Sequence, residues 1–271
     1  MKIGIIGKGF VGSAVEFGFS AQTGCDAEIK VYDKDPSKST HSLEETVNNS
    51  DFVFVSVPTP SNLDGSIHIG ILESVLSDIN NVYNNGAVIL IRSTVVPGTT
   101  RKLQEKFNLP IVFNPEFLTE RSAKFDFINQ ARFILGGEKD DTTKVKDLYQ
   151  SRFGHTGAFI ETNFETAELI KYMNNCFFAT KVSFMNEMKL VADKCGVDWE
   201  TDGFVSDGRI GHTHLAVPGP DGKMGFGGSC FPKDVQAMIT FGKELGMDLN
   251  TLQGAWTTNC NVRPEKDWEK L

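Results

Sequence analysis

The sequence has no surplus of basic residues: 27 Lys and Arg stand against 35 Asp and Glu, which gives a formal net charge of −8. Proteins that bind nucleic acid usually carry a basic face, so this balance argues against nucleic acid as a general partner. Long apolar runs are also missing. None approaches the ~20 residues that a helix needs to cross a bilayer, and we therefore expect no membrane-spanning segment.

Paired cysteines are missing as well. The chain has an odd number of cysteines, without a CxxC or any metal-ligand spacing, namely Cys25, Cys176, Cys195, Cys230 and Cys260. This usage argues against a disulfide framework, and it is typical of a protein in the reducing cytoplasm. His212 and His214 resemble a metal pair, but no third ligand is apparent, so we predict no metal site.

The N-terminal stretch KIGIIG predicts a short buried strand that ends in a glycine. It leads into GKGFVG, in which Gly7, Gly9 and Gly12 have the G-x-G-x-x-G spacing, and then into a predicted helix that runs to about Gln22. In dinucleotide-binding domains the first glycine permits a tight turn and the second lets the backbone approach a pyrophosphate. The third lets helix and strand pack closely, and the helix N-terminus faces the anion.

A second predicted strand, EIKVYD, ends at Asp33, about 20 residues beyond Gly12. A carboxylate at this place can accept hydrogen bonds from both ribose hydroxyls and would repel a 2′-phosphate. The combination of strand, glycine loop, helix and acid predicts an NAD site rather than three turn glycines. Lys34 and Lys38, near Asp33, leave NADP as an alternative.

Strand-like and helix-like segments alternate up to about residue 160. The strand-like runs include DFVFV, GAVILI, IVF and ARFILGG, and helix-like segments lie near residues 42–49, 69–83, 97–107 and 140–153. This alternation predicts an α/β fold with a Rossmann-type, doubly wound parallel sheet over residues 1–162. Ligands of such sheets bind at the carboxyl ends of the strands. The polar residues expected there are Thr59, Ser93, Thr94, Asn114 and Glu116.

After about Asn163 the pattern becomes helical. Residues 165–195 contain neither proline nor glycine and predict one long helix that Gly196 ends. Shorter helices are predicted near residues 199–207, 232–245 and 249–261, with a long loop before Cys230. Residues 163–271 are therefore predicted to form an all-helical domain built on the long helix, with a catalytic loop.

Several segments, in order along essentially the whole chain, resemble the UDP-glucose/GDP-mannose 6-dehydrogenase family of nucleotide-sugar dehydrogenases. They are GKGFVG, VPTP, STVVPGTT, NPEFLTERSA, ELIKYMNNCFFATKVSFMNEM, RIG and GFGGSCFPKD. The members that oxidise UDP-glucose are the most similar. The resemblance implies two successive NAD-dependent oxidations of a sugar C6 alcohol to the carboxylate, with UDP-glucose as the expected substrate.

The resemblance also assigns roles to residues. The family's nucleophile falls on Cys230, its paired aspartate on Asp234, and its acyl-hydrolysing glutamate on Glu116. The predicted catalytic residues are Cys230, Lys171, Asn175, Asp234, Glu116 and Thr94. The predicted cofactor-binding residues are Gly7, Gly9, Phe10, Val11, Gly12, Asp33, Thr59, Ser93, Thr94, Glu120 and Lys233. The predicted substrate-binding residues are Glu116, Phe117, Leu118, Lys171, Asn175, Arg209, Phe226 and Gly227, with Arg209 serving the neighbouring subunit.

The residue types suit these roles. Lys171 and Asn175 are four residues apart, so they share one face of the long helix, where an ammonium and an amide can stabilise an oxyanion. Cys230 precedes a predicted helix whose dipole favours a thiolate. A thiolate can hold an aldehyde as a thiohemiacetal and then as a thioester. The alternatives are that Cys230 is a packing residue, Lys171 a solvated charge and Glu116 a partner for a backbone group.

Two other functions stay open. A single-step β-hydroxyacid dehydrogenase pairs a similar Rossmann domain with helices but needs no cysteine nucleophile. A non-catalytic NAD-binding subunit is the second, because family members usually carry a further C-terminal domain over the nucleotide, and the chain stops about where it would begin. Apolar residues on several faces of the long helix also predict a homodimer, namely Leu169, Tyr172, Met173, Phe177, Val182, Met185 and Met188.

Overall fold

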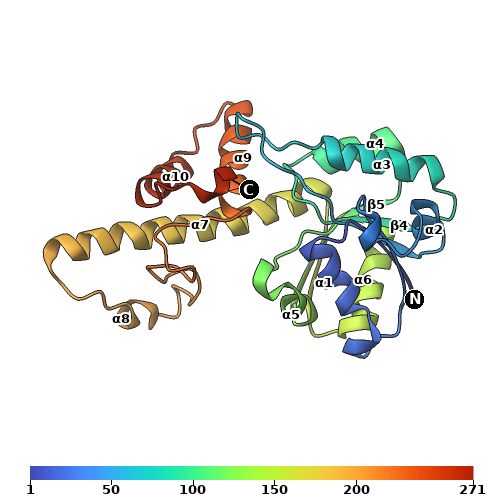
Figure 1. The fold of residues 1–271 in the computed structure, drawn as a ribbon, viewed down its shortest axis with the longest axis horizontal. Coiled ribbons are helices and arrows are strands. Elements are labelled where there is room, and N and C mark those ends of the chain that lie inside the picture. Colours follow the sequence, from blue (N-terminus) through green and yellow to red (C-terminus); the bar gives the residue numbers. More distant parts are fainter. Residues whose placement is uncertain (271) are drawn as a thin grey trace. The chain divides into compact units, whose positions relative to one another are not determined.

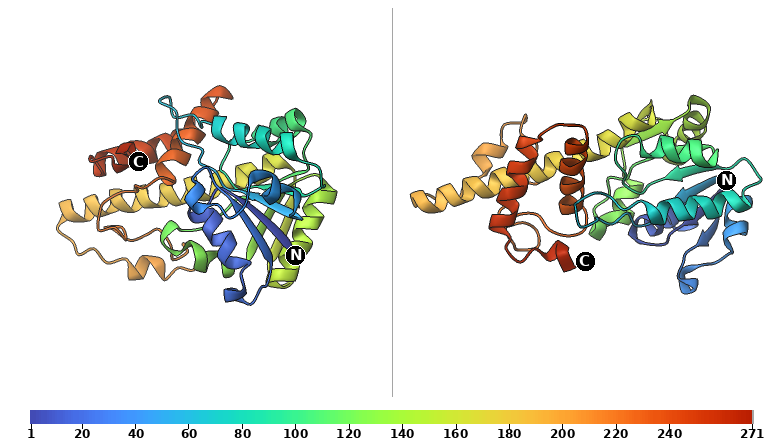
Figure 2. Two further views of the ribbon diagram at one scale, coloured as in Figure 1. Left: turned by 45° about the vertical axis from the view of Figure 1, so that its right-hand side comes forward. Right: turned by 90° about the horizontal axis from the view of Figure 1, so that it is seen from above.

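The computed structural model describes residues 1–270. They form two compact units, the first from residues 1–60 and 68–171, the second from residues 61–67 and from residue 172 onward. Helix α7 (Phe164–Cys195) belongs to both, because the boundary falls after Lys171. Figure 2 shows α7 as one unbroken helix in both views. The long helix predicted from the sequence is thus present, whereas the domain boundary at residues 162 and 163 stays a prediction.

The first unit is built on a seven-stranded sheet in the order β2-β1-β3-β4-β5-β6-β7. The strands are β1 (Lys2–Ile6), β2 (Glu28–Tyr32), β3 (Phe52–Val55), β4 (Val88–Ile91), β5 (Ile111–Phe113), β6 (Arg132–Gly137) and β7 (Ala158–Thr162). The strand order reverses at β1, which has β2 on one side and β3 on the other, both parallel to it. A reversal of this kind is the place where α/β sheets bind ligands.

The sheet is mostly, not wholly, parallel. β6 pairs antiparallel with β5 through Val112 with Gly137 and Phe113 with Gly136, and β7 then pairs parallel with β6. The sequence did not predict this reversal or β7, because an apolar strand has the same side-chain pattern in either direction. The predicted fold class, a Rossmann-type α/β unit followed by helices, is confirmed.

Helices cover both faces of the sheet, with α3 and α4 on one side and α1 and α6 on the other in Figure 1. The helices are α1 (Phe10–Gly18), α2 (Leu43–Asn48), α3 (Gly70–Val82), α4 (Thr99–Phe107), α5 (Ala123–Ile128) and α6 (Lys139–Phe153). Side chains alternate along each strand. In β3, Val53 and Val55 therefore join the core that contains α3 and α4, while Phe54 joins the core that contains α1 and α6.

The second unit consists of helices and loops. Besides α7 it contains α8 (Asp202–Val205), α9 (Phe231–Glu244) and α10 (Asn250–Val262). α8 is shorter than the predicted helix near residues 199–207, and the Glu200 side chain accepts the Asp202 N–H at 2.6 Å just before it. Within residues 1–270, no helix combines the length and the apolar character that a membrane span requires.

A short excursion from the first unit completes the second. Residues 61–67 leave the Rossmann-type unit, and Ser61 pairs with Ile67 in an isolated antiparallel bridge. At the tip of this excursion the Asp64 carbonyl accepts a hydrogen bond from Thr240 of α9 at 3.0 Å. The second unit therefore depends on residues far apart in the sequence.

Candidate active site

Three glycines after β1 shape a cradle for a dinucleotide. Gly7 has a φ of +90°, and a Cβ there would lie 2.4 Å from the Ser56 carbonyl oxygen. A Cβ on Gly12 would lie 2.0 Å from the Gly7 carbonyl oxygen, so a side chain would push α1 off the loop. A Cβ on Gly9 would have no other atom within 4 Å. The loop is therefore tight at Gly7 and Gly12 and open at Gly9, as a bound pyrophosphate requires.

The start of α1 also suits an anion. Among the described residues, no side chain caps the helix at Gly9, where Phe10 and Val11 begin the first turn. The first N–H groups of a helix have no partner inside the helix, and together with the helix dipole they favour a phosphate. The predicted pyrophosphate site therefore fits the backbone that is present.

Asp33 is fixed against the same loop. Its Oδ2 accepts a hydrogen bond from the Lys8 N–H at 2.6 Å, and its Oδ1 accepts one from the Asp35 N–H at 2.8 Å. An ionised carboxylate has about four lone-pair sites, so Asp33 can still accept hydrogen bonds from a ribose. Asp33 lies directly after β2, and its role toward a ribose stays a prediction.

The predicted hydroxyl residues hold loops together at the carboxyl ends of the strands. The Thr59 hydroxyl donates to the Thr94 carbonyl at 2.9 Å, and the Ser93 hydroxyl donates to the Val57 carbonyl at 2.7 Å. These bonds tie the loop after β3 to the loop after β4. Thr59 and Ser93 therefore have a structural role, the joining of these two loops, in addition to the cofactor contacts predicted for them.

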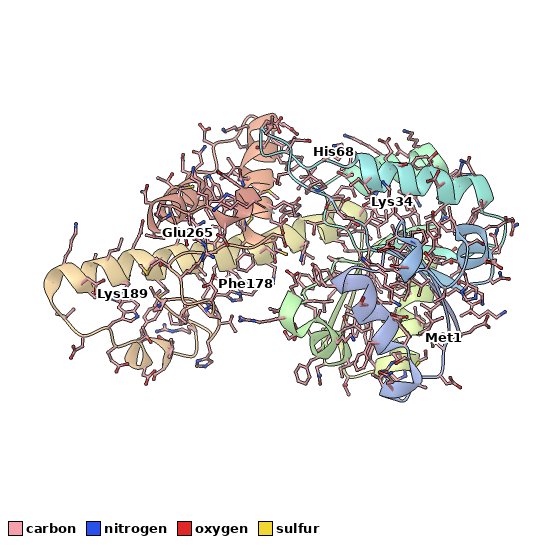
Figure 3. The ribbon with its side chains drawn as sticks, in the orientation of Figure 1. Met1, Lys34, His68, Phe178, Lys189 and Glu265 are labelled. Carbon is pink, nitrogen blue, oxygen red and sulfur yellow. The ribbon has the colours of Figure 1, made fainter. Side chains whose placement is uncertain are left out.

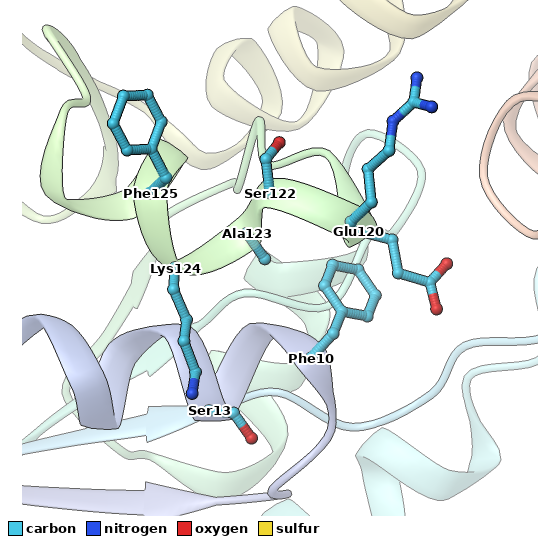
Figure 4. Close-up of a pocket in the computed structure, with 8 residues that line it drawn as sticks. Phe10, Ser13, Glu120, Ser122, Ala123, Lys124 and Phe125 are labelled. Carbon is cyan, nitrogen blue, oxygen red and sulfur yellow. The ribbon is translucent and has the colours of Figure 1, made fainter. Parts of the chain in front are cut away.

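An open pocket of about 350 Å³ lies between α1 and the segment before and along α5. Figure 4 shows Phe10 and Ser13 of α1 together with Glu120, Lys124 and Phe125, which all line it. Glu120 is exposed here, at the start of a short 3-10 turn. The pocket thus joins predicted cofactor residues, Phe10 and Glu120, that are far apart in the sequence.

Glu116 and Lys171 form a buried ion pair in the first unit. The Lys171 ammonium donates to the Glu116 Oε1 at 2.9 Å and to the Glu116 carbonyl at 2.6 Å, and both side chains are less than one-tenth exposed. The Glu116 Oε2 accepts the Leu118 N–H at 2.7 Å. The Lys171 ammonium also lies 5.4 Å from the centre of the Phe117 ring. Four of the predicted substrate-binding residues are thus together.

The second unit holds the other predicted catalytic group. Cys230 is the N-cap residue of α9, and its carbonyl accepts the Asp234 N–H at 2.9 Å. The buried Asp234 carboxylate accepts from the Asn175 amide at 2.6 Å and from the Lys233 ammonium, also at 2.6 Å. Asn175 and Lys233 therefore orient Asp234 one turn after Cys230.

The two cysteines near Asp234 have different surroundings. Cys176 is buried, and burial, followed by the charge of Asp234, raises the pKa of its thiol well above the usual range. Cys230 is only half-buried, at a helix N-terminus, with the Ser229 hydroxyl 3.7 Å from its sulfur. A reactive thiolate is favoured by such a place and disfavoured by burial, so the environment separates Cys230 from Cys176.

Arg209 lies apart from these groups, on the surface. Its side chain is 89% exposed and pairs with Asp207 two residues earlier. Its predicted role in the site of a neighbouring subunit stays a prediction.

The sequence analysis did not find the side chains that hold Phe226 in the loop before Cys230. Asn259 of α10 accepts the Phe226 N–H at 2.7 Å and donates to the Phe226 carbonyl at 2.9 Å. Asn259 is completely buried, and one buried amide on a helix leaves no distinct pattern in the sequence.

Comparison with known proteins assigns the family. Residues 29–152 match the NAD-binding domain model of the UDP-glucose/GDP-mannose dehydrogenase family, and residues 165–261 match its central-domain model. UDP-glucose 6-dehydrogenase TuaD of Bacillus subtilis is 31% identical over 83% of this chain and 49% of its own length. The UDP-glucose 6-dehydrogenase of Pseudomonas aeruginosa is 34% identical over 83% of this chain and 51% of its own length. The chain thus spans about half the length of these relatives.

A solved structure agrees with this assignment. A UDP-glucose dehydrogenase from the archaeon Pyrobaculum islandicum superposes with a TM-score of 0.81 and 28% identity, over 95% of this chain and 67% of its own. With both family models matched in order and the glycine cradle in place, the chain belongs to the UDP-glucose/GDP-mannose dehydrogenase family, with NAD as the cofactor of its first domain.

Proposed function

We propose that the chain oxidises the C6 alcohol of a nucleotide sugar to the carboxylate in two steps, with UDP-glucose as the substrate and Cys230 as the covalent nucleophile. The observation that carries the proposal is the place of Cys230, half-buried at the N-terminus of α9 and one turn before the oriented carboxylate of Asp234. A single-step hydroxyacid dehydrogenase has no use for a cysteine held in this way.

NAD, when bound, supplies the hydride acceptor for each two-electron oxidation. Lys171 and Asn175 donate hydrogen bonds to the sugar oxygen while Asp234 takes the alcohol proton through water. The Cys230 thiolate then forms a C–S bond with the aldehyde carbon, and loss of a second hydride from that carbon leaves a thioester. Glu116 activates a water that breaks the C–S bond, which releases the carboxylate and restores the thiolate.

The substrate proposal is tested by counting NADH over a panel of limiting substrates: UDP-glucose, GDP-mannose and UDP-N-acetyl sugars. We expect two NADH and one acid per UDP-glucose, with lower kcat/KM for the other sugars. A stoichiometry of one NADH per sugar, or a clear preference for GDP-mannose, would contradict the corresponding part of the proposal.

We propose that Asp33 makes the site selective for NAD. Asp33→Asn keeps an oxygen that can accept the Lys8 N–H but removes the charge that would face a 2′-phosphate. The ratio of kcat/KM for NADP to that for NAD should rise at least about tenfold, because a repulsion of about 1.4 kcal/mol disappears. Asp35→Asn, which changes an exposed carboxylate next to the same loop, should leave the ratio unchanged.

We propose that the chain forms a homodimer through α7. Among the exposed apolar side chains of α7, one stripe has a nearly seven-residue repeat: Met173 (61% exposed), Phe177 (61%), Phe184 (48%), Met188 (38%) and Val191 (52%). A stripe of this kind suits packing against another helix. Tyr172 and Met185, two of the residues behind the sequence prediction, are buried within the chain and do not contribute to it.

The dimer is tested by sedimentation velocity at micromolar concentration. We expect a dimer for the wild type and a monomer for Phe184→Glu, because a buried unpaired charge opposes association. Leu190→Glu is the matched control: Leu190 is also exposed, at 43%, but its place six residues from Phe184 puts it about 120° away around α7, outside the stripe. A monomeric wild type with full activity would contradict the proposal.

A further inference from the structure

The loop that leads to Cys230 lies against a buried arginine. Arg263, which follows α10, has a side chain that is only 3% exposed. Its guanidinium donates to Asp267 through Nε at 2.7 Å and Nη2 at 2.9 Å, and to Asp221 through Nη2 at 2.7 Å. The third nitrogen, Nη1, donates to the Met224 carbonyl at 3.2 Å. All three guanidinium nitrogens therefore donate hydrogen bonds, which fixes the orientation of the group.

Gly227 lies directly on this guanidinium. A Cβ at Gly227 would be 2.4 Å from Arg263 Nη2 and 2.6 Å from its Cζ and Nε. Any side chain there would push the arginine away from the loop. The contact with Arg263 thus requires a glycine at position 227, independently of the substrate contact predicted for Gly227.

Asp267 links the arginine to the next residue of the loop. Its carboxylate accepts the hydrogen bonds from Arg263, and this guanidinium, with the backbone amide of Gly228 nearby, lowers the pKa of Asp267 to about 2. The carboxylate is therefore ionised at neutral pH. Gly228 has a φ of +73°, a conformation that needs support from outside the loop because glycine can leave it easily.

Two asparagine side chains also hold the loop before Cys230. Asn186 of α7 accepts the Gly225 N–H at 2.9 Å, and Asn259 holds both backbone groups of Phe226. Four successive residues, 225–228, are therefore each in contact with a polar side chain from another element. The last of them comes two positions before Cys230.

We propose that Arg263 and Asp267 are positioning residues for Cys230: they fix Gly227 and Gly228 so that the sulfur is held at the N-terminus of α9. The inference rests on the proposed function, in which Cys230 is the nucleophile. A glycine-rich loop has little rigidity of its own. A displacement of about 1 Å at a reacting group can lower the rate about 100-fold.

The test uses Asp267→Asn and Arg263→Lys in the full chain. Asparagine keeps an oxygen that can accept from Arg263 but loses the charge, and lysine keeps the charge but loses the planar set of donors. The rate at which iodoacetamide alkylates Cys230 is measured over a range of pH from peptide masses, with the exposed Cys195 as internal reference. The midpoint is the pH at which this rate is half of its maximum. This midpoint depends on the pH at which the Cys230 thiolate forms. The accessibility of the sulfur changes only the maximal rate of alkylation, which is reached at high pH.

For both variants we expect the Cys230 midpoint to rise by about half a pH unit, the size of a helix-terminus effect, with no shift for Cys195. With UDP-glucose, kcat should fall about 10- to 100-fold, while the dissociation constant for NAD changes less than about twofold. Arg263→Lys should retain more activity than Arg263→Met, which leaves two carboxylates without their partner.

Glu265→Gln is the matched control. Glu265, labelled in Figure 3, pairs with Lys223 at 3.2 Å in an exposed contact between the same two segments. We expect it to keep the wild-type midpoint and kcat. If Asp267→Asn and Arg263→Lys also keep both values while Cys230→Ala is inactive in the second oxidation, the positioning role is wrong and the proposed function stands. If Cys230→Ala retains both oxidations, the proposed function is wrong, whatever the midpoint does.

Discussion

Cys230→Ala is expected to turn a four-electron oxidation into a two-electron one. With limiting UDP-glucose the wild type should form two NADH and an acid, whereas the variant should form one NADH and release an aldehyde. Lys171, Asn175 and Asp234 remain to handle the alcohol proton, but the group that anchors the acyl carbon is gone. The rate of the second oxidation should fall at least about 10³-fold, as for the loss of other covalent nucleophiles.

Two further substitutions of cysteine are compared with Cys230→Ala. Cys195→Ala removes an exposed thiol at the end of α7 and should still give two NADH. Cys230→Ser offers a poorer nucleophile and a poorer leaving group, so an ester should form and hydrolyse slowly. If Cys230→Ala still yields two NADH per sugar at a near wild-type rate, Cys230 only packs against the glycine loop and the proposed mechanism is wrong.

Glu116→Gln gives an independent view of the same intermediate. Without a base to activate water, the thioester on Cys230 should accumulate and add the mass of the sugar nucleotide to the intact protein. The change also removes the negative charge that faces the buried Lys171, so a lower Tm is expected. The added mass is informative even in a less stable protein. It should disappear in the double variant Glu116→Gln, Cys230→Ala.

The second large effect concerns the glycine loop after β1, where we expect one substitution to weaken NAD binding and another to lower the stability of the protein. Gly9→Val should raise the dissociation constant of NAD more than about 100-fold while the Tm of the protein without cofactor changes little, because no other atom lies within 4 Å of the new Cβ. Gly12→Ala should lower the Tm by roughly 5–10 °C, since a Cβ 2.0 Å from the Gly7 carbonyl forces a shift that costs about 2–3 kcal/mol.

Calorimetric titration with NAD and thermal melts without it measure both quantities. Gly254→Ala serves as the control, because Gly254 lies in α10 with no atom within 4 Å of a new Cβ. It should leave NAD binding unchanged and raise stability by about 0.5–1 kcal/mol through helix propensity. Equal losses of stability in Gly9→Val and Gly12→Ala would show that the loop, and not the bound phosphate, requires both glycines.

The elements with strong local patterns could be predicted from the sequence. The glycine loop, the helix near residues 42–49 and the helix after Cys230 all appear where they were expected. The antiparallel pairing of β6 could not, because strand direction is decided by the connection and by packing, neither of which leaves a periodicity.

For the site, residue types were more predictable than partners. Lys171 and Asn175 were expected as a pair, yet each has a carboxylate partner of its own, Glu116 and Asp234. Contacts between residues 55 and 59 positions apart depend on the fold, which no local pattern reveals. Arg263 was missed for the same reason, since its role becomes visible only when Gly227 is seen lying on the guanidinium.

The excursion at residues 61–67 has a consequence for how the protein is made. Asp64 and its partner Thr240 are 176 residues apart. At ~5–20 residues per second, a ribosome needs roughly 9–35 s to add the second after the first. For that time the tip of the excursion has no α9 to pack on. The strands around it can pair at once, so the second unit should be the last part of the nascent chain to become protected from proteases.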